Sequence, residues 1–260
     1  MGLFCRKYKF SPERYAGTFL GAPAAETNRV APADAETTFA PGPAAEMVYC
    51  FWTGDNPLTP NRVASLETMR EHLGVEVKLI TPANLGDYIL PDHPLHPGYE
   101  FLSLNHRSDY LRCYFMHHHG GGYGDVKRYS HPWKGAFDRL NGSDKWGLGY
   151  GEESKRGVAR VGGAIGQDMR KHWRLLVGNG SFIFRPRTPM TAEWYGEVTR
   201  RMDGYLDELR RNPGDMWGKN EGYPIPWTGM QGDIFHPLSL KYHDRLLKDD
   251  SIKPSFKEYR

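Results

Sequence analysis

Residues 105–128 are NHRSDYLRCYFMHHHGGGYGDVKR. Leu104, Leu111 and Phe115 recur at helical intervals along this segment, which predicts a helix with one apolar face that ends near residue 119. The glycine triplet that follows is typical of a helix stop. A short extended segment, Tyr123–Lys127, comes next. Because open α/β sheets bind ligands beyond the carboxyl ends of their strands, the charged residues of this segment are candidates for a site.

Two charged residues of the expected helix, Asp109 and Arg112, are candidates for binding a ligand. They are three positions apart, so they share one face of the helix and can reach the same molecule. The alternative is an ion pair on the helix surface, which contributes little to stability. The spacing by itself is compatible with both interpretations.

The ordered residues of this segment resemble the core motif of glycosyltransferase family 32, which has a sugar-binding region containing an Asp-x-Asp motif, and that of the capsular polysaccharide synthesis proteins. The motif runs Ser-Asp-x-x-Arg, a helix, Gly-Gly-x-Tyr and then Asp-x-Asp. The chain departs from it at Lys127, where the family has its second aspartate. The matching residues are Ser108, Asp109, Arg112, Gly121, Gly122, Tyr123 and Asp125.

The resemblance implies a single nucleotide-binding domain with the α/β fold of the glycosyltransferase A type, in which helices flank a mostly parallel sheet. It also implies a hexosyl- or pentosyltransferase that moves a sugar from a nucleotide-sugar donor, a UDP-sugar, to the hydroxyl of a glycan or glycoconjugate. Members of such families retain the anomeric configuration. The sequence offers no residue that stands out as an enzyme nucleophile.

Site residues follow from the same resemblance. Asp125, Lys127, Asp109 and Arg112 are the expected catalytic residues. The residues expected to bind the nucleotide-sugar or line its site are Trp52, Thr53, Gly121, Gly122, Tyr123, Asn179, Trp227, Gln231 and His243. For Trp52 a place in the core is an equal alternative.

The lysine at position 127 leaves three interpretations of the chemistry. Negative charge grows on the leaving diphosphate during sugar transfer, so a cation must be positioned there beforehand. In the first interpretation, Lys127 partly or wholly replaces the metal ion, while Asp125 binds sugar or ribose hydroxyls and holds the lysine. Alternatively, Asp125 alone still binds Mn2+ or Mg2+. In the third interpretation the chain is a non-catalytic carbohydrate- or nucleotide-binding relative that Lys127 has disabled.

The flanking sequence predicts the rest of an α/β fold. The apolar run Met47–Trp52 is expected to be a strand buried on both faces. Strands and helices alternate after it, which indicates a mostly parallel sheet. The further elements expected are helices over 61–72, 82–88 and 134–140, a strand over 75–80, two strands joined by a tight turn within 173–188, and a helix from Pro189.

Composition excludes several classes of protein. The net charge is only +3 with both signs interspersed, which does not indicate a nucleic-acid partner. No apolar run is long enough to span a membrane. The three scattered cysteines indicate no disulfide framework, so a reducing compartment is expected.

The consecutive histidines His117–His119 cannot converge on one ion, because neighbouring residues of a helix point in different directions. They are expected at the solvated end of their helix.

The N-terminal part is expected to differ from the rest of the chain. Residues 1–46 are expected to be an arm and an Ala/Pro-rich linker, and residues 47–260 the catalytic domain. The start, MGLFCR, weakly resembles an acylation signal, because the serine or threonine usual at position 6 is missing. We expect a cytoplasmic protein, with attachment to the periphery of a membrane as the alternative.

Overall fold

The computed structural model describes residues 8–21 and 41–257. Six strands form one mixed sheet in the order β2-β1-β3-β5-β4-β6, in which β5 is antiparallel to both of its neighbours and the other pairs are parallel. The predicted α/β fold with a mostly parallel sheet is confirmed. The strands are β1 (Met47–Phe51), β2 (Glu76–Ile80), β3 (Gly121–Gly124), β4 (Gly147–Gly151), β5 (Val177–Phe184) and β6 (Leu246–Lys248).

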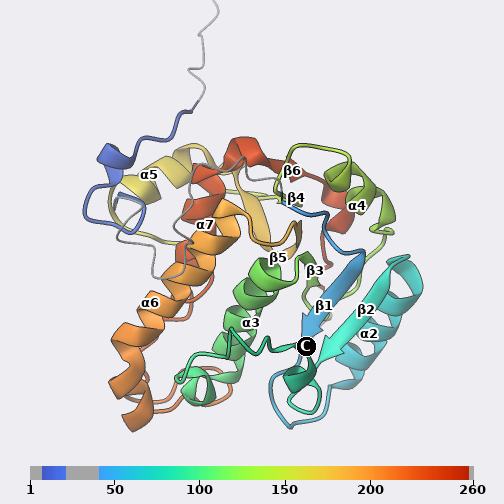
Figure 1. Ribbon diagram of the computed structural model, residues 1–260, viewed down its shortest axis with the longest axis horizontal. Coiled ribbons are helices and arrows are strands. Elements are labelled where there is room, and N and C mark those ends of the chain that lie inside the picture. Colours follow the sequence, from blue (N-terminus) through green and yellow to red (C-terminus); the bar gives the residue numbers. More distant parts are fainter. Residues whose placement is uncertain (1–7, 22–40, 258–260) are drawn as a thin grey trace, which may run out of the picture.

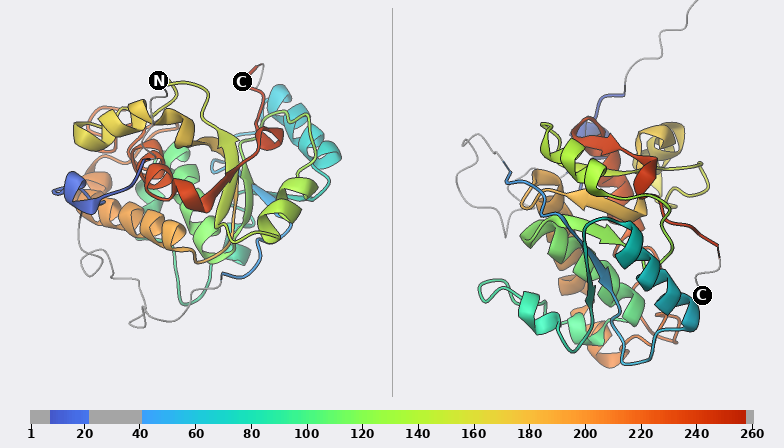
Figure 2. Two further views of the ribbon diagram at one scale, coloured as in Figure 1. Left: turned by 90° about the horizontal axis from the view of Figure 1, so that it is seen from above. Right: turned by 90° about the vertical axis from the view of Figure 1, so that its right-hand side faces the viewer.

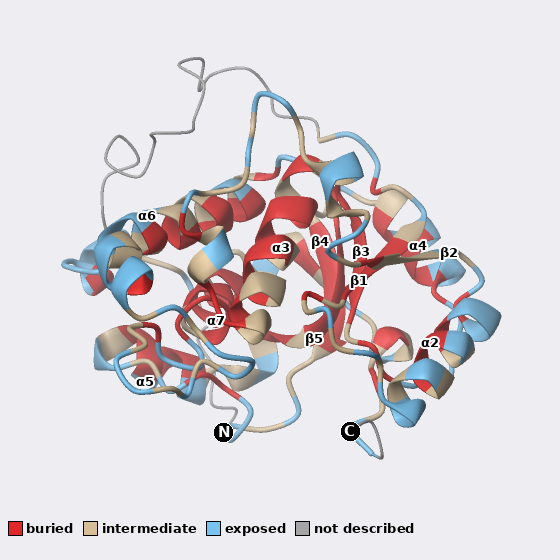
Figure 3. Ribbon diagram, turned by 90° about the horizontal axis from the view of Figure 1, so that it is seen from below, coloured by how far each residue is buried: buried red, intermediate tan, exposed pale blue. Residues whose placement is uncertain are grey.

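Helices cover both faces of this sheet (Figure 1). One face carries α2 (Pro60–His72) and α4 (Lys134–Asn141), and the other carries α3 (Leu104–His118), α5 (Gly163–Lys171), α6 (Pro189–Arg211) and α7 (Gly232–Lys241). Figure 3 shows the sheet edge-on between these two layers. This single-domain arrangement is consistent with the glycosyltransferase A type. Short 3-10 helices are Pro12–Tyr15, Leu85–Tyr88, Tyr99–Phe101, Trp173–Leu175, His243–Arg245 and Asp250–Ile252.

The core is divided by the sheet into two hydrophobic clusters. Alternate residues of β1 point to opposite faces, so Tyr49 and Phe51 join the larger cluster under α3, while Val48 and Cys50 join the smaller one under α2 and α4. This explains why the apolar run of β1 contains no polar residue, since both of its faces are buried.

Helix α3 is delimited by local chemistry. The Ser103 side chain accepts a hydrogen bond from the backbone N–H of His106 and caps the N-terminus. The helix ends before Gly120, whose φ of 66° belongs to the left-handed region. The extended segment starts earlier than predicted, at Gly121. Glycine is favoured at the start of β3 because Gly121 has a φ of 93°, in the left-handed region that side chains rarely adopt.

The prediction of two strands joined by a tight turn within 173–188 is wrong. The segment contains the 3-10 helix Trp173–Leu175 and the single strand β5. A Cβ on Gly178 would lie 2.1 Å from a ring atom of Tyr150, so that glycine permits close packing and makes no turn. The helix expected from Pro189 is confirmed, and Thr188 caps it.

The histidines at the end of α3 are also placed differently from the prediction. His118 is buried, with its ring 4.5 Å from that of Tyr114, and burial lowers its pKa to about 3. His117 is half-buried, and burial lowers its pKa to about 4. They do not lie at a solvated helix end, because the segment after β2 and helix α6 cover this part of α3.

Residues 8–21 pack against the domain beside α5 (Figure 2). Arg14 and Tyr15 both donate hydrogen bonds to Asp168 of α5, and Leu20 is buried in the larger cluster. The N-terminal MGLFCR and most of the expected linker lie outside the described residues. Among the described helices, none is long and apolar enough to cross a lipid bilayer.

Candidate functional site

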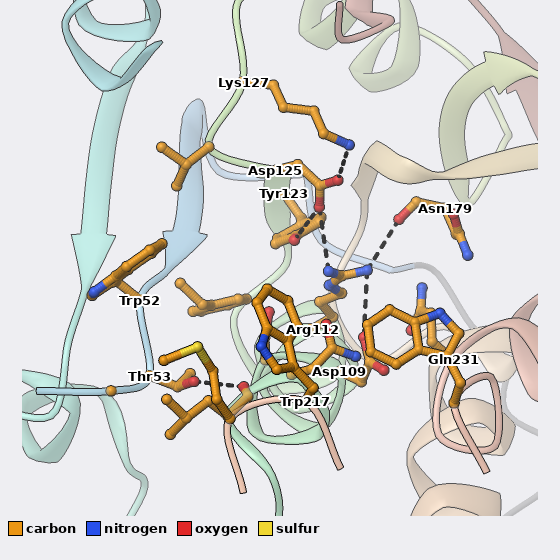
Figure 4. A pocket seen from close by; sticks show the side chains of 18 of the residues that line it. Trp52, Thr53, Asp109, Arg112, Tyr123, Asp125, Lys127, Asn179, Trp217 and Gln231 are labelled. Atoms are coloured by element: carbon orange, nitrogen blue, oxygen red, sulfur yellow. Dashed lines mark hydrogen bonds and ion pairs between the residues drawn. The ribbon is translucent and has the colours of Figure 1, made fainter. Parts of the chain in front are cut away.

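A pocket of about 360 Å3 opens where β1 and β3 end and where α3 and α7 begin. This is the carboxyl edge of the parallel strands, where open α/β sheets bind ligands. Its lining comes from segments that are far apart in the sequence, mainly 51–56, 104–112, 123–127 and 216–232, together with Arg62 and Asn179. Figure 4 shows Trp52 at one side of the pocket, Arg112 and Asp125 in the middle, and Gln231 at the other side.

The centre of the pocket is built around the carboxylate of Asp125. Its Oδ1 accepts hydrogen bonds from the Tyr123 hydroxyl at 2.6 Å and from Nη2 of Arg112 at 3.2 Å. Its Oδ2 accepts one from Nζ of Lys127 at 2.6 Å. Arg112 also lies 3.5 Å from Asp109 and stacks over the ring of Tyr123. The candidate catalytic residues therefore meet in one connected group.

Burial controls the charges of this group. Burial acts to raise the pKa of Asp125, but Lys127 and Arg112 together hold it below its ordinary value. The pKa of Asp109 is raised, because burial outweighs the attraction of Arg112. With Arg62, the lining contains three cationic and two anionic side chains, a formal excess of one positive charge. Such a lining favours an anionic ligand.

The surroundings of Asp125 do not fit a divalent ion such as Mn2+ or Mg2+. Both oxygens of Asp125 already accept hydrogen bonds from cationic or hydroxyl donors. An ion bound to Oδ2 would lie beside the ammonium of Lys127, and the two positive charges would repel each other. Divalent ions of this kind also take six or more oxygen ligands, and Lys127 removes a carboxylate where the family motif supplies one.

One side of the pocket consists of the residues after β1. The indole N–H of Trp52 donates to the backbone oxygen of Asn56, and the hydroxyl of Thr53 donates to that of Leu104. These bonds fix the segment while leaving the Trp52 ring half-buried in the pocket wall. A second cavity of about 150 Å3 lies on the other side of Thr53, between the end of β2 and α3.

The opposite side of the pocket is formed by the segment that leads into α7. Gln231 is buried, and neither atom of its amide group has a hydrogen-bond partner among the described residues. A buried amide without partners costs free energy unless a ligand or water satisfies it. Trp227 also belongs to the pocket lining, and the backbone oxygen of Asn179 accepts a hydrogen bond from Arg112.

Three of the predicted site residues lie elsewhere. Gly121 and Gly122 are buried within β3, behind the pocket, where they allow close packing. The prediction for His243 is corrected, because its ring packs against Tyr8 of the N-terminal arm and its Nδ1 contacts the backbone oxygen of Leu240. None of the three belongs to the pocket lining.

Sequence reasoning missed several lining residues, notably Arg62, Asn56 and Trp217. Trp217 could have been recognised as a site residue from its position in a segment rich in Gly, Pro and Asp, because such a loop does not need an aromatic side chain for a core. Arg62 gave no signal. It is one of several charged residues on α2, and in the folded chain its Nη1 donates to the backbone oxygen of Val126, in the segment that follows β3.

The C-terminal segment passes close to the centre of the site. The backbone N–H of Ser255 donates to the oxygen of Arg128, and Nζ of Lys127 lies 4.5 Å from the centre of the Phe256 ring. Lys127 is therefore held between a carboxylate and an aromatic face, which fixes its position at the wall of the pocket.

Comparison with models of protein families finds none that matches the chain, and no curated protein matches it either. The resemblance to glycosyltransferase family 32 thus rests on the motif residues alone. The fold and the pocket define a class of protein: an α/β domain with a cleft, lined in part by cationic side chains, at the carboxyl edge of its sheet.

Proposed function

We propose that this protein is a glycosyltransferase that moves a sugar from a nucleotide-sugar donor, a UDP-sugar, to a glycan hydroxyl with retention of configuration. The observation that carries the proposal is the position of Arg112 and Lys127 on one carboxylate in the middle of the pocket. On one side of these two cations the pocket wall contains the aromatic ring of Trp52, which is suited to pack against a nucleobase. On the other side it contains the amide of Gln231, which is suited to hydrogen-bond sugar hydroxyls because it has no partner among the described residues.

The chemistry assigned to these residues is electrostatic. As the bond from the sugar to the diphosphate breaks, negative charge grows on the leaving phosphate. Arg112 and Lys127 are positioned before the reaction, in a half-enclosed site where their charges are poorly screened by water. Asp125 orients both cations. Asp109 accepts hydrogen bonds from the sugar hydroxyls, and the amide of Gln231 both accepts hydrogen bonds from them and donates to them. The leaving phosphate takes the proton of the acceptor hydroxyl.

The proposal is tested by measuring the release of free nucleotide from UDP-, GDP- and CMP-sugars, each with EDTA and with added Mn2+. We expect turnover of a UDP-sugar that survives EDTA, because Lys127 supplies the charge that a metal supplies elsewhere. Turnover that requires Mn2+ would contradict the role of Lys127 while leaving the transferase assignment. Binding of UDP without any turnover would instead support a non-catalytic relative.

A further inference from the structure

The described residues include five exposed large hydrophobic side chains, and three of them lie on one loop at the pocket. This loop, residues 212–231 between α6 and α7, is here called the mouth loop. Its exposed large hydrophobic residues are Met216, Trp217 and Trp227, and about half of the surface of each tryptophan is accessible to water. Exposed apolar surface gathered at the edge of a pocket indicates a binding surface.

The mouth loop is tied firmly to the N-terminus of α3. The first N–H groups of a helix have no partners within it. Here the N–H of Leu104 donates to the oxygen of Asp215, and that of Asn105 donates to the oxygen of Met216. The Tyr223 hydroxyl contacts the buried ring of His106 at 2.8 Å. The loop therefore keeps a fixed position relative to Asp109 and Arg112, which lie on the same helix.

The backbone beside Trp217 is equally constrained. Oδ1 of Asp215 accepts hydrogen bonds from the backbone N–H groups of Trp217, Gly218 and Lys219. Gly218 has a φ of 65°, and a Cβ there would lie 2.7 Å from the ring of Tyr223. The tight turn thus presents the indole of Trp217 outward at the edge of the pocket, where Figure 4 shows it in front of Arg112.

From this geometry we infer that Trp217 and Trp227 form an aromatic platform that binds a pyranose ring of the acceptor. The inference rests on the proposed function and adds the place of the second substrate. The acceptor hydroxyl has to reach the donor sugar from the open side of the pocket. The faces of sugar rings carry C–H groups that pack on indoles, while their hydroxyls remain in water.

The experiment uses p-nitrophenyl α- and β-glycosides of glucose, galactose, mannose and N-acetylglucosamine as acceptors, with the UDP-sugar that gives the fastest nucleotide release. Product transfer and donor hydrolysis are measured together for the wild type, Trp217→Ala, Trp217→Phe and Trp173→Ala. Trp173 is the matched control, because it is an indole outside the pocket lining.

For Trp217→Ala we expect the ratio of transfer to hydrolysis to fall about ten-fold, mainly through the KM of the acceptor, a factor that corresponds to about 1.4 kcal/mol of binding. Trp217→Phe should recover most of the ratio, and Trp173→Ala should keep it unchanged. An unchanged ratio in Trp217→Ala, or an equal loss of transfer and hydrolysis, overturns the platform while the transferase assignment stands. A wild type that releases no nucleotide from any donor overturns the proposed function itself, and the platform with it.

Discussion

Asp125 and Asp168 are two carboxylates with nearly the same partners in different places. Asp168 accepts hydrogen bonds from Arg14 and Tyr15, and Asp125 accepts them from Arg112 and Tyr123. The difference is that Asp125 also binds Lys127 and lies in the pocket lining, whereas Arg14 is half-exposed on the N-terminal arm.

This difference distinguishes a contact that only holds the N-terminal arm in place from a group of residues that can act on a ligand. At Asp168 one carboxylate balances one cation, so the contact carries no excess charge and holds the arm to α5. At Asp125 one carboxylate orients two cations toward a pocket with a formal positive excess. The same pair of residue types thus positions charge for a ligand only where the fold adds a second cation and an opening.

The largest expected effect is that of Asp125→Asn. The change keeps the shape of the side chain but removes the charge that orients Arg112 and Lys127, so we expect nucleotide release to fall by about 100-fold or more. It also leaves two buried cations poorly compensated, which should lower the free energy of unfolding by about 3 kcal/mol. Nucleotide release and thermal unfolding, measured on the same preparation, check both effects. Near-normal turnover would show that the site is wrongly placed.

The next largest effect is expected from replacing Lys127, which supplies one of the two cations. Lys127→Met should lower nucleotide release about 100-fold in EDTA, since one positive charge is lost from the leaving-group side. Lys127→Arg should recover part of the activity because it restores the charge. Lys127→Asp recreates the Asp-x-Asp pair, so its activity should depend on added Mn2+. If Lys127→Met is as active as the wild type in EDTA, the lysine is not the cation that the reaction uses.

The smallest effect is that of Asp168→Asn, the isosteric counterpart of Asp125→Asn. We expect unchanged nucleotide release and a loss of about 1 kcal/mol in the free energy of unfolding at pH 7, because Arg14 is half-exposed and its charge is screened by water. The hydrogen bond from Arg14 lowers the pKa of Asp168 below 3.8, so this contribution is present above that pH and is lost as the pH falls through the lowered value. Thermal unfolding of variant and wild type should therefore converge in acid. A large loss of activity would contradict the separation of the two carboxylates.

The central segment of the fold was predictable because its signals are local. The spacing of apolar residues gave helix α3, and the separation of Asp109 and Arg112 placed both on one face. Strand β1 followed from an uninterrupted apolar run. The strand β5 was mispredicted because glycine marks both turns and close contacts, and only the position of Tyr150 distinguishes them.

The sequence by itself determined the α/β fold class and the short segment that carries Asp109, Arg112, Asp125 and Lys127, because helix periodicity and near-neighbour spacing are properties of the chain alone. The tertiary structure alone decided that Arg112 joins Lys127 on the carboxylate of Asp125, that Arg62 and Trp217 reach the pocket, and that His243 does not. These contacts form between segments that are far apart in the sequence and that pack against one sheet, so a local sequence pattern does not encode them.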